Sequence, residues 1–99
     1  IADLVLHLHD TRGTAVACAY RALQRGVGRF DSSCGGLGGC PYAPGATGNL
    51  ATGDLDFLCR GLGIETGIEA AGLFKAAGAI EAALGRPLPG RVYRASTGS

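Results

Sequence analysis

The chain has 99 residues, of which 46% are hydrophobic and 17% charged, and its formal net charge at pH 7 is +1. This length allows at most one domain, and the composition is too apolar for a disordered segment. Because the lysines and arginines form no run, we exclude nucleic acid and an anionic membrane as main partners. We find neither an apolar stretch of about 20 residues nor a secretory signal, and we expect a protein that is not secreted.

The first predicted strand, residues 4–9, reads Leu-Val-Leu-His-Leu-His. Successive side chains of a strand point to opposite faces, so His7 and His9 lie on the same face as Val5. Asp10 follows, where a loop from strand to helix is expected. The pattern therefore predicts two imidazoles side by side at the end of a strand.

A helix is expected over residues 13–23, where small apolar residues recur with helical spacing. Thr11 is expected to cap its start, Cys18 to lie on its buried face, and Gly26 to end it. A second strand is expected over residues 27–32. A strand, a helix and a strand within about thirty residues predict a βαβ unit, whose two strands are parallel.

Residues 30–51 hold six glycines and two prolines between two short strand-like runs, so they predict a long shaped loop. Leu37 and Tyr42 argue against a flexible linker, which would be more polar. Cys40 is the reactive side chain in the middle of this loop. The four cysteines lack the spacing of a metal finger and are expected to be reduced thiols, although Cys34 and Cys40 could form a redox pair.

The remaining chain predicts one short strand, two helices and a frayed tail, at residues 47–51, 52–62, 69–84 and 91–99 in that order. Thr52 is expected to cap the first of these helices, and Cys59 and Leu62 to lie on its buried side. Gly85 and Pro87 are expected to stop the second. Strands and helices thus alternate along most of the sequence, which is typical of an α/β fold.

The motifs H-L-H-D, F-D-S-S, G-L-G-G-C-P-Y-A and G-N, at these distances, resemble the C-terminal portion of the 3-hydroxy-3-methylglutaryl-CoA lyases. This family belongs to a metal-dependent carbon-carbon lyase superfamily that uses a TIM barrel. The resemblance implies an α/β fold that forms about three βα units of the C-terminal part of a (β/α)8 barrel. It covers residues 1–92 as a partial lyase domain, and residues 93–99 are expected to form a flexible tail.

The resemblance also implies roles for single residues: metal ligation by His7, His9 and Asn49, catalysis by Cys40 and His7, and support beside the metal by Asp10 and Asp54. Many relatives have a glutamate where this chain has Gly53. Loss of that carboxylate is expected to weaken the active site and the first turn of the helix, and Asp54 to compensate in part. No residue is assigned to binding of coenzyme A.

Two imidazoles and one oxygen ligand suit Mg²⁺, Mn²⁺, Fe²⁺ or Zn²⁺, and we expect Mg²⁺ or Mn²⁺ as cofactor. Such an ion chelates a substrate's hydroxyl and carbonyl oxygens and stabilises the enolate-like charge of carbon-carbon cleavage. The expected reaction is a retro-Claisen cleavage of an acyl-CoA substrate to acetyl-CoA and acetoacetate, as in leucine degradation and ketone body metabolism. The expected compartment is the cytoplasm or the mitochondrial matrix.

Other interpretations stay open. The histidines could be a hydrogen-bonded pair in a barrel interior, Asn49 part of a Gly-Asn turn, and Cys40 a loop thiol with no proton to transfer. The protein could be an acyl-CoA condensing synthase of the same superfamily, although Cys40 favours the lyase, or it could be a non-catalytic partial domain.

A strand already under way near Ile1 predicts a fragment that lacks the first barrel strand. We expect it to be inactive without the missing N-terminal strands or a homo-oligomer partner.

Overall fold

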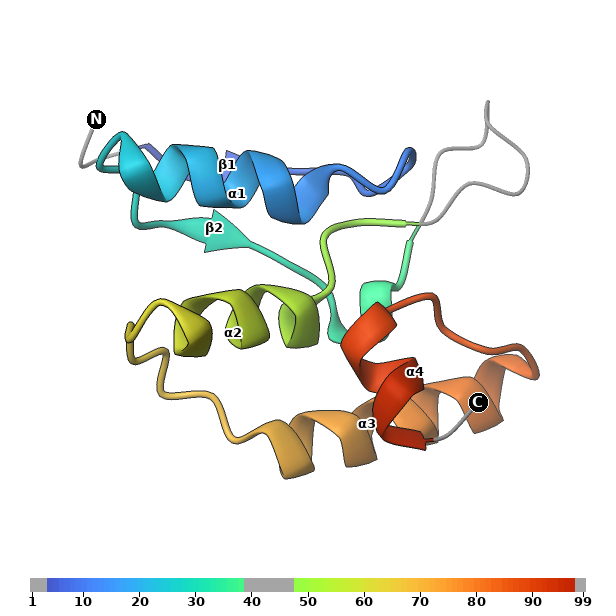
Figure 1. The fold of residues 1–99 in the computed structure, drawn as a ribbon. Coiled ribbons are helices and arrows are strands. Elements are labelled where there is room, and N and C mark those ends of the chain that lie inside the picture. Colours follow the sequence, from blue (N-terminus) through green and yellow to red (C-terminus); the bar gives the residue numbers. More distant parts are fainter. Residues whose placement is uncertain (1–3, 39–47, 98–99) are drawn as a thin grey trace.

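The computed structural model describes residues 4–38 and 48–97. The elements in chain order are β1 (Leu6–His7), α1 (Ala15–Gln24), β2 (Phe30–Asp31), a short 3-10 helix η1 (Cys34–Gly36), α2 (Thr52–Gly61), α3 (Ala70–Leu84) and α4 (Arg91–Thr97). Figure 1 shows α2 between the layer formed by α1 with the strands and the longer helix α3. In the described ranges, no helix has both the length and the apolar character that a membrane crossing requires.

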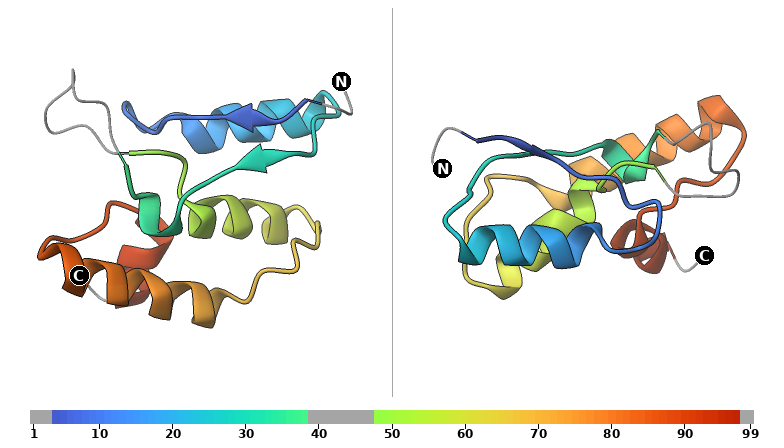
Figure 2. Two further views of the ribbon diagram at one scale, coloured as in Figure 1. Left: turned by 180° about the vertical axis from the view of Figure 1, so that it is seen from behind. Right: turned by 90° about the horizontal axis from the view of Figure 1, so that it is seen from above.

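The two strands form a parallel pair in which Leu6 lies opposite Phe30 and His7 opposite Asp31. The predicted βαβ unit with parallel strands is therefore confirmed, and α1 is its connection, lying on one side of the strands (Figure 2). Both strands are shorter than the expected 4–9 and 27–32. In the described part of the chain the sheet has two strands, so β1 and β2 each pair with one neighbouring strand.

The expected strand over residues 47–51 is present as two isolated bridges, with residue 47 outside the described ranges. His9 pairs with Asn49 in antiparallel fashion, and Ser33 pairs with Ala51 in parallel fashion. The amide of Leu50 donates to the carbonyl of Leu8 and its own carbonyl accepts from the amide of Ser33, at 2.9 Å in both cases. The segment after the glycine-rich loop is thus held between the ends of the first two strands.

The expected helix caps are wrong at both positions. The amide of Ala15, the first residue of α1, donates to the carboxylate of Asp10 at 3.1 Å, so Asp10 rather than Thr11 satisfies this helix end. The helix also begins two residues later than expected. At α2 the hydroxyl of Thr52 lies 2.6 Å from that of Ser32, because Thr52 is already inside the first turn and its side chain faces the end of β2.

The burial expected from helical spacing is confirmed at Cys59, which is buried, and wrong at Cys18 and Leu62, which are exposed. In α1 the buried residues are Ala15 and Ala19, so the buried face is narrow and Cys18 lies beside it. Leu62 is the residue after the last turn of α2, and 43% of its surface is accessible. Spacing alone does not show how wide a face the neighbouring elements cover.

The frayed tail expected from residue 91 is wrong for residues 91–97, which form α4. Tyr93 is buried there, and its ring centroid lies 5.8 Å from that of Phe74 on α3. Leu88, which is fully buried, belongs to the same apolar cluster. Packing on α3 therefore orders the end of the chain, while the expected end of the lyase domain at residue 92 stays a prediction.

A carboxylate from another helix caps α4. Asp54 on α2 is 6% exposed, and its two oxygens accept hydrogen bonds from the amides of Val92 at 2.8 Å and Arg91 at 3.3 Å. The first amides of a helix have no partner within the helix, and a negative charge at this end is favourable. This contact links the start of α2 to the start of α4.

We expect Asp54→Ala to lower the free energy of unfolding of the full-length protein by about 2 kcal/mol, since it removes a cap and leaves two amides without their acceptor. Urea denaturation followed by circular dichroism measures the change. The control is Asp54→Asn, which retains one acceptor oxygen and is expected to lose about half as much. Wild-type stability of Asp54→Ala would contradict the capping role.

Candidate metal centre

The two histidines meet beyond the end of β1. Nε2 of His7 lies 3.1 Å from Nε2 of His9, and the two rings are edge to face, with centroids 4.8 Å apart and planes at 78°. His7 is the last residue of β1, and His9 follows two residues later in the bridge to Asn49. The two imidazoles therefore share one side of the chain, as period-two alternation predicts.

The separation of the two nitrogens is compatible with one shared ion. Two imidazole nitrogens that each lie about 2.1 Å from a metal and subtend about a right angle are about 3 Å apart. The same separation also suits a single hydrogen bond between the rings, in which one nitrogen carries the proton. The geometry therefore fits both a shared ion and the alternative of a hydrogen-bonded histidine pair.

Asn49 is brought to the histidines by backbone pairing. Residues directly opposite each other in an antiparallel pair have side chains on the same face, so Asn49 lies on the face of His9. Its amide nitrogen donates to the carbonyl of Leu37 at 3.3 Å, which turns the amide oxygen away from that carbonyl. Asn49 lies in a bridge rather than in a turn. A Cβ atom on Gly38 would lie 2.8 Å from the Asn49 nitrogen, so only glycine fits beside it without displacing this amide.

Asp31 is a further residue of the site that the sequence reasoning did not single out. Its carboxylate oxygen lies 2.6 Å from Nδ1 of His7, and both side chains are about half exposed. The contact follows from the parallel register, which sets His7 opposite Asp31. The motif F-D-S-S marked this position, but the register of the two strands is needed to show which residue the aspartate faces.

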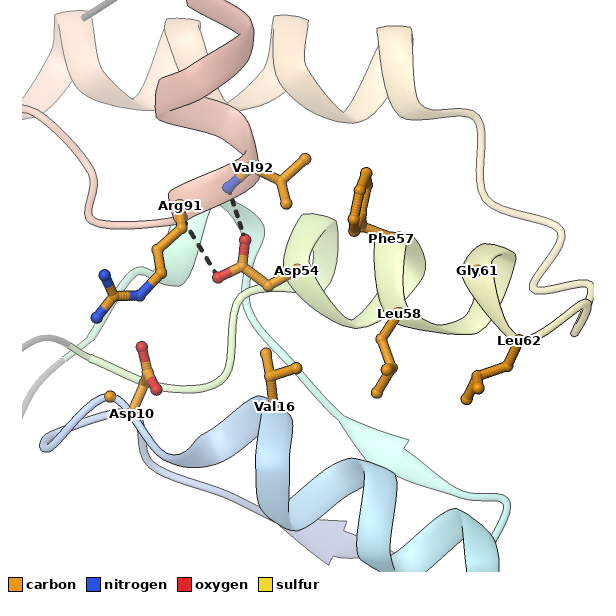
Figure 3. Close-up of a pocket in the computed structure, with 10 residues that line it drawn as sticks. Asp10, Val16, Asp54, Phe57, Leu58, Gly61, Leu62, Arg91 and Val92 are labelled. Carbon is orange, nitrogen blue, oxygen red and sulfur yellow. Dashed lines mark hydrogen bonds between the residues drawn. The ribbon is translucent and has the colours of Figure 1, made fainter.

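The two carboxylates expected to support the metal hold helix ends in this structure. Asp10 follows His9 directly and accepts from the first amide of α1, while Asp54 caps α4. Figure 3 shows the side chain of Arg91 extending from α4 toward Asp10. Asp10 thus holds the start of α1 and Asp54 the start of α4, and an effect of either on a bound metal stays a prediction.

Cys40, the expected catalytic cysteine, lies outside the described residues. Cys34 is described, and its thiol donates to the carbonyl of Leu73 at 3.7 Å while it packs against the apolar cluster of α3 and α4. Burial raises the pKa of the Cys34 thiol, which keeps it protonated and weakly reactive at neutral pH. The three described cysteines, Cys18, Cys34 and Cys59, are free thiols.

Gly53 has a packing reason in this structure. It is buried, and a Cβ atom built on it would lie 2.9 Å from Cε1 of Phe74 on α3. A larger residue at this position would require the Phe74 ring to move. The close contact of α2 with α3 thus takes the space in which a side chain at position 53 would begin.

A cavity of about 450 Å³ lies between α1, α2 and α4 (Figure 3). Val16, Leu58 and Val92 give it a largely apolar wall, and Asp10 and Arg91 lie at one end. His7, His9 and Asn49 are not among the residues that line it. This apolar cavity is therefore separate from the polar donors that fit a metal.

The donor set fits a divalent ion, provided that the amide oxygen of Asn49 is counted. In residues 4–38 and 48–97, no three His, Cys, Asp or Glu side chains form a possible metal site by themselves. Two imidazoles and one amide oxygen are all neutral donors, so a further carboxylate ligand would balance the charge of the ion. Together, the fold and these donors define an α/β protein with a candidate divalent-metal centre beyond the end of a parallel strand.

The HMGL-like family model matches residues 1–80, and the chain belongs to this family. Hydroxymethylglutaryl-CoA lyase YngG of Bacillus subtilis is 51% identical over 89 residues, which are 90% of this chain and 30% of that protein. An (R)-citramalyl-CoA lyase of Chloroflexus aurantiacus is 50% identical over 92 residues, 93% of this chain and 29% of that protein.

Solved structures of HMG-CoA lyases contain a region with the fold of this chain. The crystal structure of the Bacillus subtilis HMG-CoA lyase matches 97% of this chain with a TM-score of 0.93 and 47% identity. An Acinetobacter baumannii HMG-CoA lyase, solved in complex with coenzyme A and 3-methylmalate, matches 93% with a TM-score of 0.83 and 42% identity. The chain spans about 30% of the length of these relatives, 32% and 30% respectively.

Proposed function

We propose that the full-length protein is a metal-dependent lyase that cleaves 3-hydroxy-3-methylglutaryl-CoA to acetyl-CoA and acetoacetate. The observation that carries this proposal is the pair of imidazole nitrogens 3.1 Å apart, with Asn49 paired to His9, in a chain of the HMGL-like family. Sequence identity of about half to named lyases over 90% of the chain supports it. The comparisons give no support to the condensing synthase or the non-catalytic domain considered above.

In this proposal His7, His9 and Asn49 hold Mg²⁺ or Mn²⁺. When bound, the divalent ion supplies Lewis-acid stabilisation for the hydroxyl and carbonyl oxygens of the substrate. The histidines contribute neutral donors in a fixed mutual orientation, and the Leu37 carbonyl holds the Asn49 amide so that its oxygen is the available ligand atom. We propose Mg²⁺ or Mn²⁺ because the remaining ligands of the ion would be oxygen atoms, and these ions prefer oxygen ligands.

Two residues were candidates for proton transfer, Cys40 in the glycine-rich loop and His7 in β1. Cys40 is the proposed acid that protonates the thioester enolate, as the family resemblance implies. His7 has one ring nitrogen directed at Asp31 and the other at His9. A His7 that binds the ion has no free nitrogen for proton transfer, so its ligand role is favoured over the base role that the sequence also allowed.

The described elements are proposed to be part of a (β/α)8 barrel. Parallel β1 and β2 joined by α1, and the parallel bridge from Ser33 to Ala51 followed by α2, support successive units of such a barrel. Three of eight units would be somewhat more than the 30% of the Bacillus subtilis relative that the chain spans. Leu4 and Val5, which are more than half exposed, would then contact neighbouring strands from the remainder of the barrel or from a partner subunit.

A second substrate is favoured by one specific observation. The (R)-citramalyl-CoA lyase of Chloroflexus aurantiacus is as similar to this chain as the hydroxymethylglutaryl-CoA lyases are, at 50% identity. The acyl-CoA class is therefore better supported than the particular acyl group. We place (R)-citramalyl-CoA second because two solved structures similar to this chain, from Bacillus subtilis and Pseudomonas aeruginosa, are those of HMG-CoA lyases.

The test is an assay of the full-length protein after removal of metal by a chelator. Cleavage of 3-hydroxy-3-methylglutaryl-CoA and of (R)-citramalyl-CoA is followed with and without added Mg²⁺ or Mn²⁺. We expect turnover only with the ion, and a higher kcat/KM for the first substrate. A higher value for the second would select the alternative, and no cleavage of either with any ion would overturn the proposed function.

A further inference from the structure

We propose that Asp31 is a positioning residue that fixes the tautomer of His7, so that the Nε2 lone pair of His7 faces the candidate metal position. This inference rests on the proposed metal centre. It assigns a role to a residue that is not itself a ligand, and it predicts a property of His7 that exists before any metal binds.

The placement of Asp31 is a consequence of strand pairing. In the parallel register of β1 and β2, His7 lies opposite Asp31. The two side chains meet with 2.6 Å between Nδ1 and the carboxylate oxygen. This separation is slightly shorter than the roughly 2.7 to 2.9 Å of a charge-assisted hydrogen bond from nitrogen to a carboxylate, so the two groups are in direct hydrogen-bond contact.

The direction of this hydrogen bond determines where the His7 proton is. An ionised carboxylate only accepts hydrogen bonds, so Nδ1 of His7 carries the proton and donates it. A neutral imidazole has one proton, and Nε2 then holds a lone pair. Without Asp31, nothing in this contact would prevent the proton from residing on Nε2, where it would block ligation of a metal.

The other end of the ring points at the second donor. Nε2 of His7 is 3.1 Å from Nε2 of His9. Without an ion, His9 satisfies this contact by donating its own Nε2 proton to the lone pair of His7. When an ion binds, only His9 has to change tautomer, its proton moving from Nε2 to Nδ1, because Asp31 already holds the His7 ring in the ligating form. A carboxylate behind a ligating histidine also raises the basicity of the ligand.

We expect Asp31→Ala in the full-length protein to weaken Mn²⁺ binding by about 10- to 100-fold, the usual effect of losing a partner behind a metal ligand. Asp31→Asn is expected to recover part of this loss, because its amide oxygen still accepts from Nδ1. The control is Glu65→Ala, which also removes one exposed carboxylate but from the loop between α2 and α3. Free Mn²⁺ is measured by electron paramagnetic resonance during titration, with folding checked by circular dichroism.

A second measurement needs no variant at the proposed residue. In the metal-free wild-type protein labelled with ¹⁵N-histidine, NMR should show His7 protonated at Nδ1 and unprotonated at Nε2, with His7→Asn identifying its signals. A wild-type His7 protonated at Nε2 and not at Nδ1 would overturn the inference, as would Mn²⁺ binding by folded Asp31→Ala equal to that of the wild type. A wild-type protein that binds no Mn²⁺ would instead refute the proposed metal centre, and the tautomer would still decide whether Asp31 orients His7.

Discussion

Replacement of His9 by alanine in the full-length protein is expected to lower metal affinity by about 10-fold or more and to reduce turnover at limiting metal at least as much. The reason is geometric, since Nε2 of His9 is the second nitrogen of the pair and lies 3.1 Å from that of His7. Its loss leaves one imidazole and one amide oxygen as described donors. Elemental analysis of the purified protein, together with Mn²⁺ titration, measures the effect.

The control for His9→Ala is Val5→Ala, a substitution expected on the same face of the first strand, with circular dichroism to check folding because Val5 would contact neighbouring strands in the complete barrel. It removes side-chain volume without removing a metal donor, so metal content is expected to stay at the wild-type value. Equal metal content in His9→Ala, Val5→Ala and the wild type would show that His9 is not a ligand.

Substitution of Cys40 by serine is expected to cut turnover by about 10²-fold or more while metal content stays unchanged, because a serine hydroxyl is a much poorer proton donor than a thiol. The proposed role of Cys40 rests on the family resemblance of its loop. Steady-state kinetics with 3-hydroxy-3-methylglutaryl-CoA, at saturating Mg²⁺ or Mn²⁺, separates an effect on kcat from one on metal binding.

Cys34→Ser is the control, and the structure explains why it should be silent. The Cys34 thiol donates to the carbonyl of Leu73 at 3.7 Å, and a serine hydroxyl retains a donor at this position. Burial raises the pKa of Cys34, so the thiolate that a redox exchange needs is disfavoured. Comparable losses of turnover at Cys34 and Cys40 would support a redox pair and contradict a separate role for Cys40.

Local periodicity predicted the part of the site that lies within one segment. Alternation of side chains placed His7 and His9 on one side of the chain, and their nitrogens indeed meet. The strand-helix-strand pattern also predicted the parallel pairing of β1 and β2. Both properties depend on the sequence between residues 4 and 32, and neither requires knowledge of distant contacts.

Features that depend on distant contacts were missed. Asp31 faces His7 only because of the register between two strands 24 residues apart in the chain. The last helix, α4, was expected as a frayed tail. Its cap comes from Asp54, 37 residues before Arg91, and its buried Tyr93 packs on α3. Local propensity contains none of this information.

The most direct test of the proposed metal centre is anomalous diffraction from crystals of the full-length protein soaked with Mn²⁺. We predict a single strong peak at the histidine pair, about 2.0 to 2.3 Å from Nε2 of His7, Nε2 of His9 and the amide oxygen of Asn49. A Mn²⁺ ion bound at a different site, with the two imidazoles still in contact with each other, would contradict it.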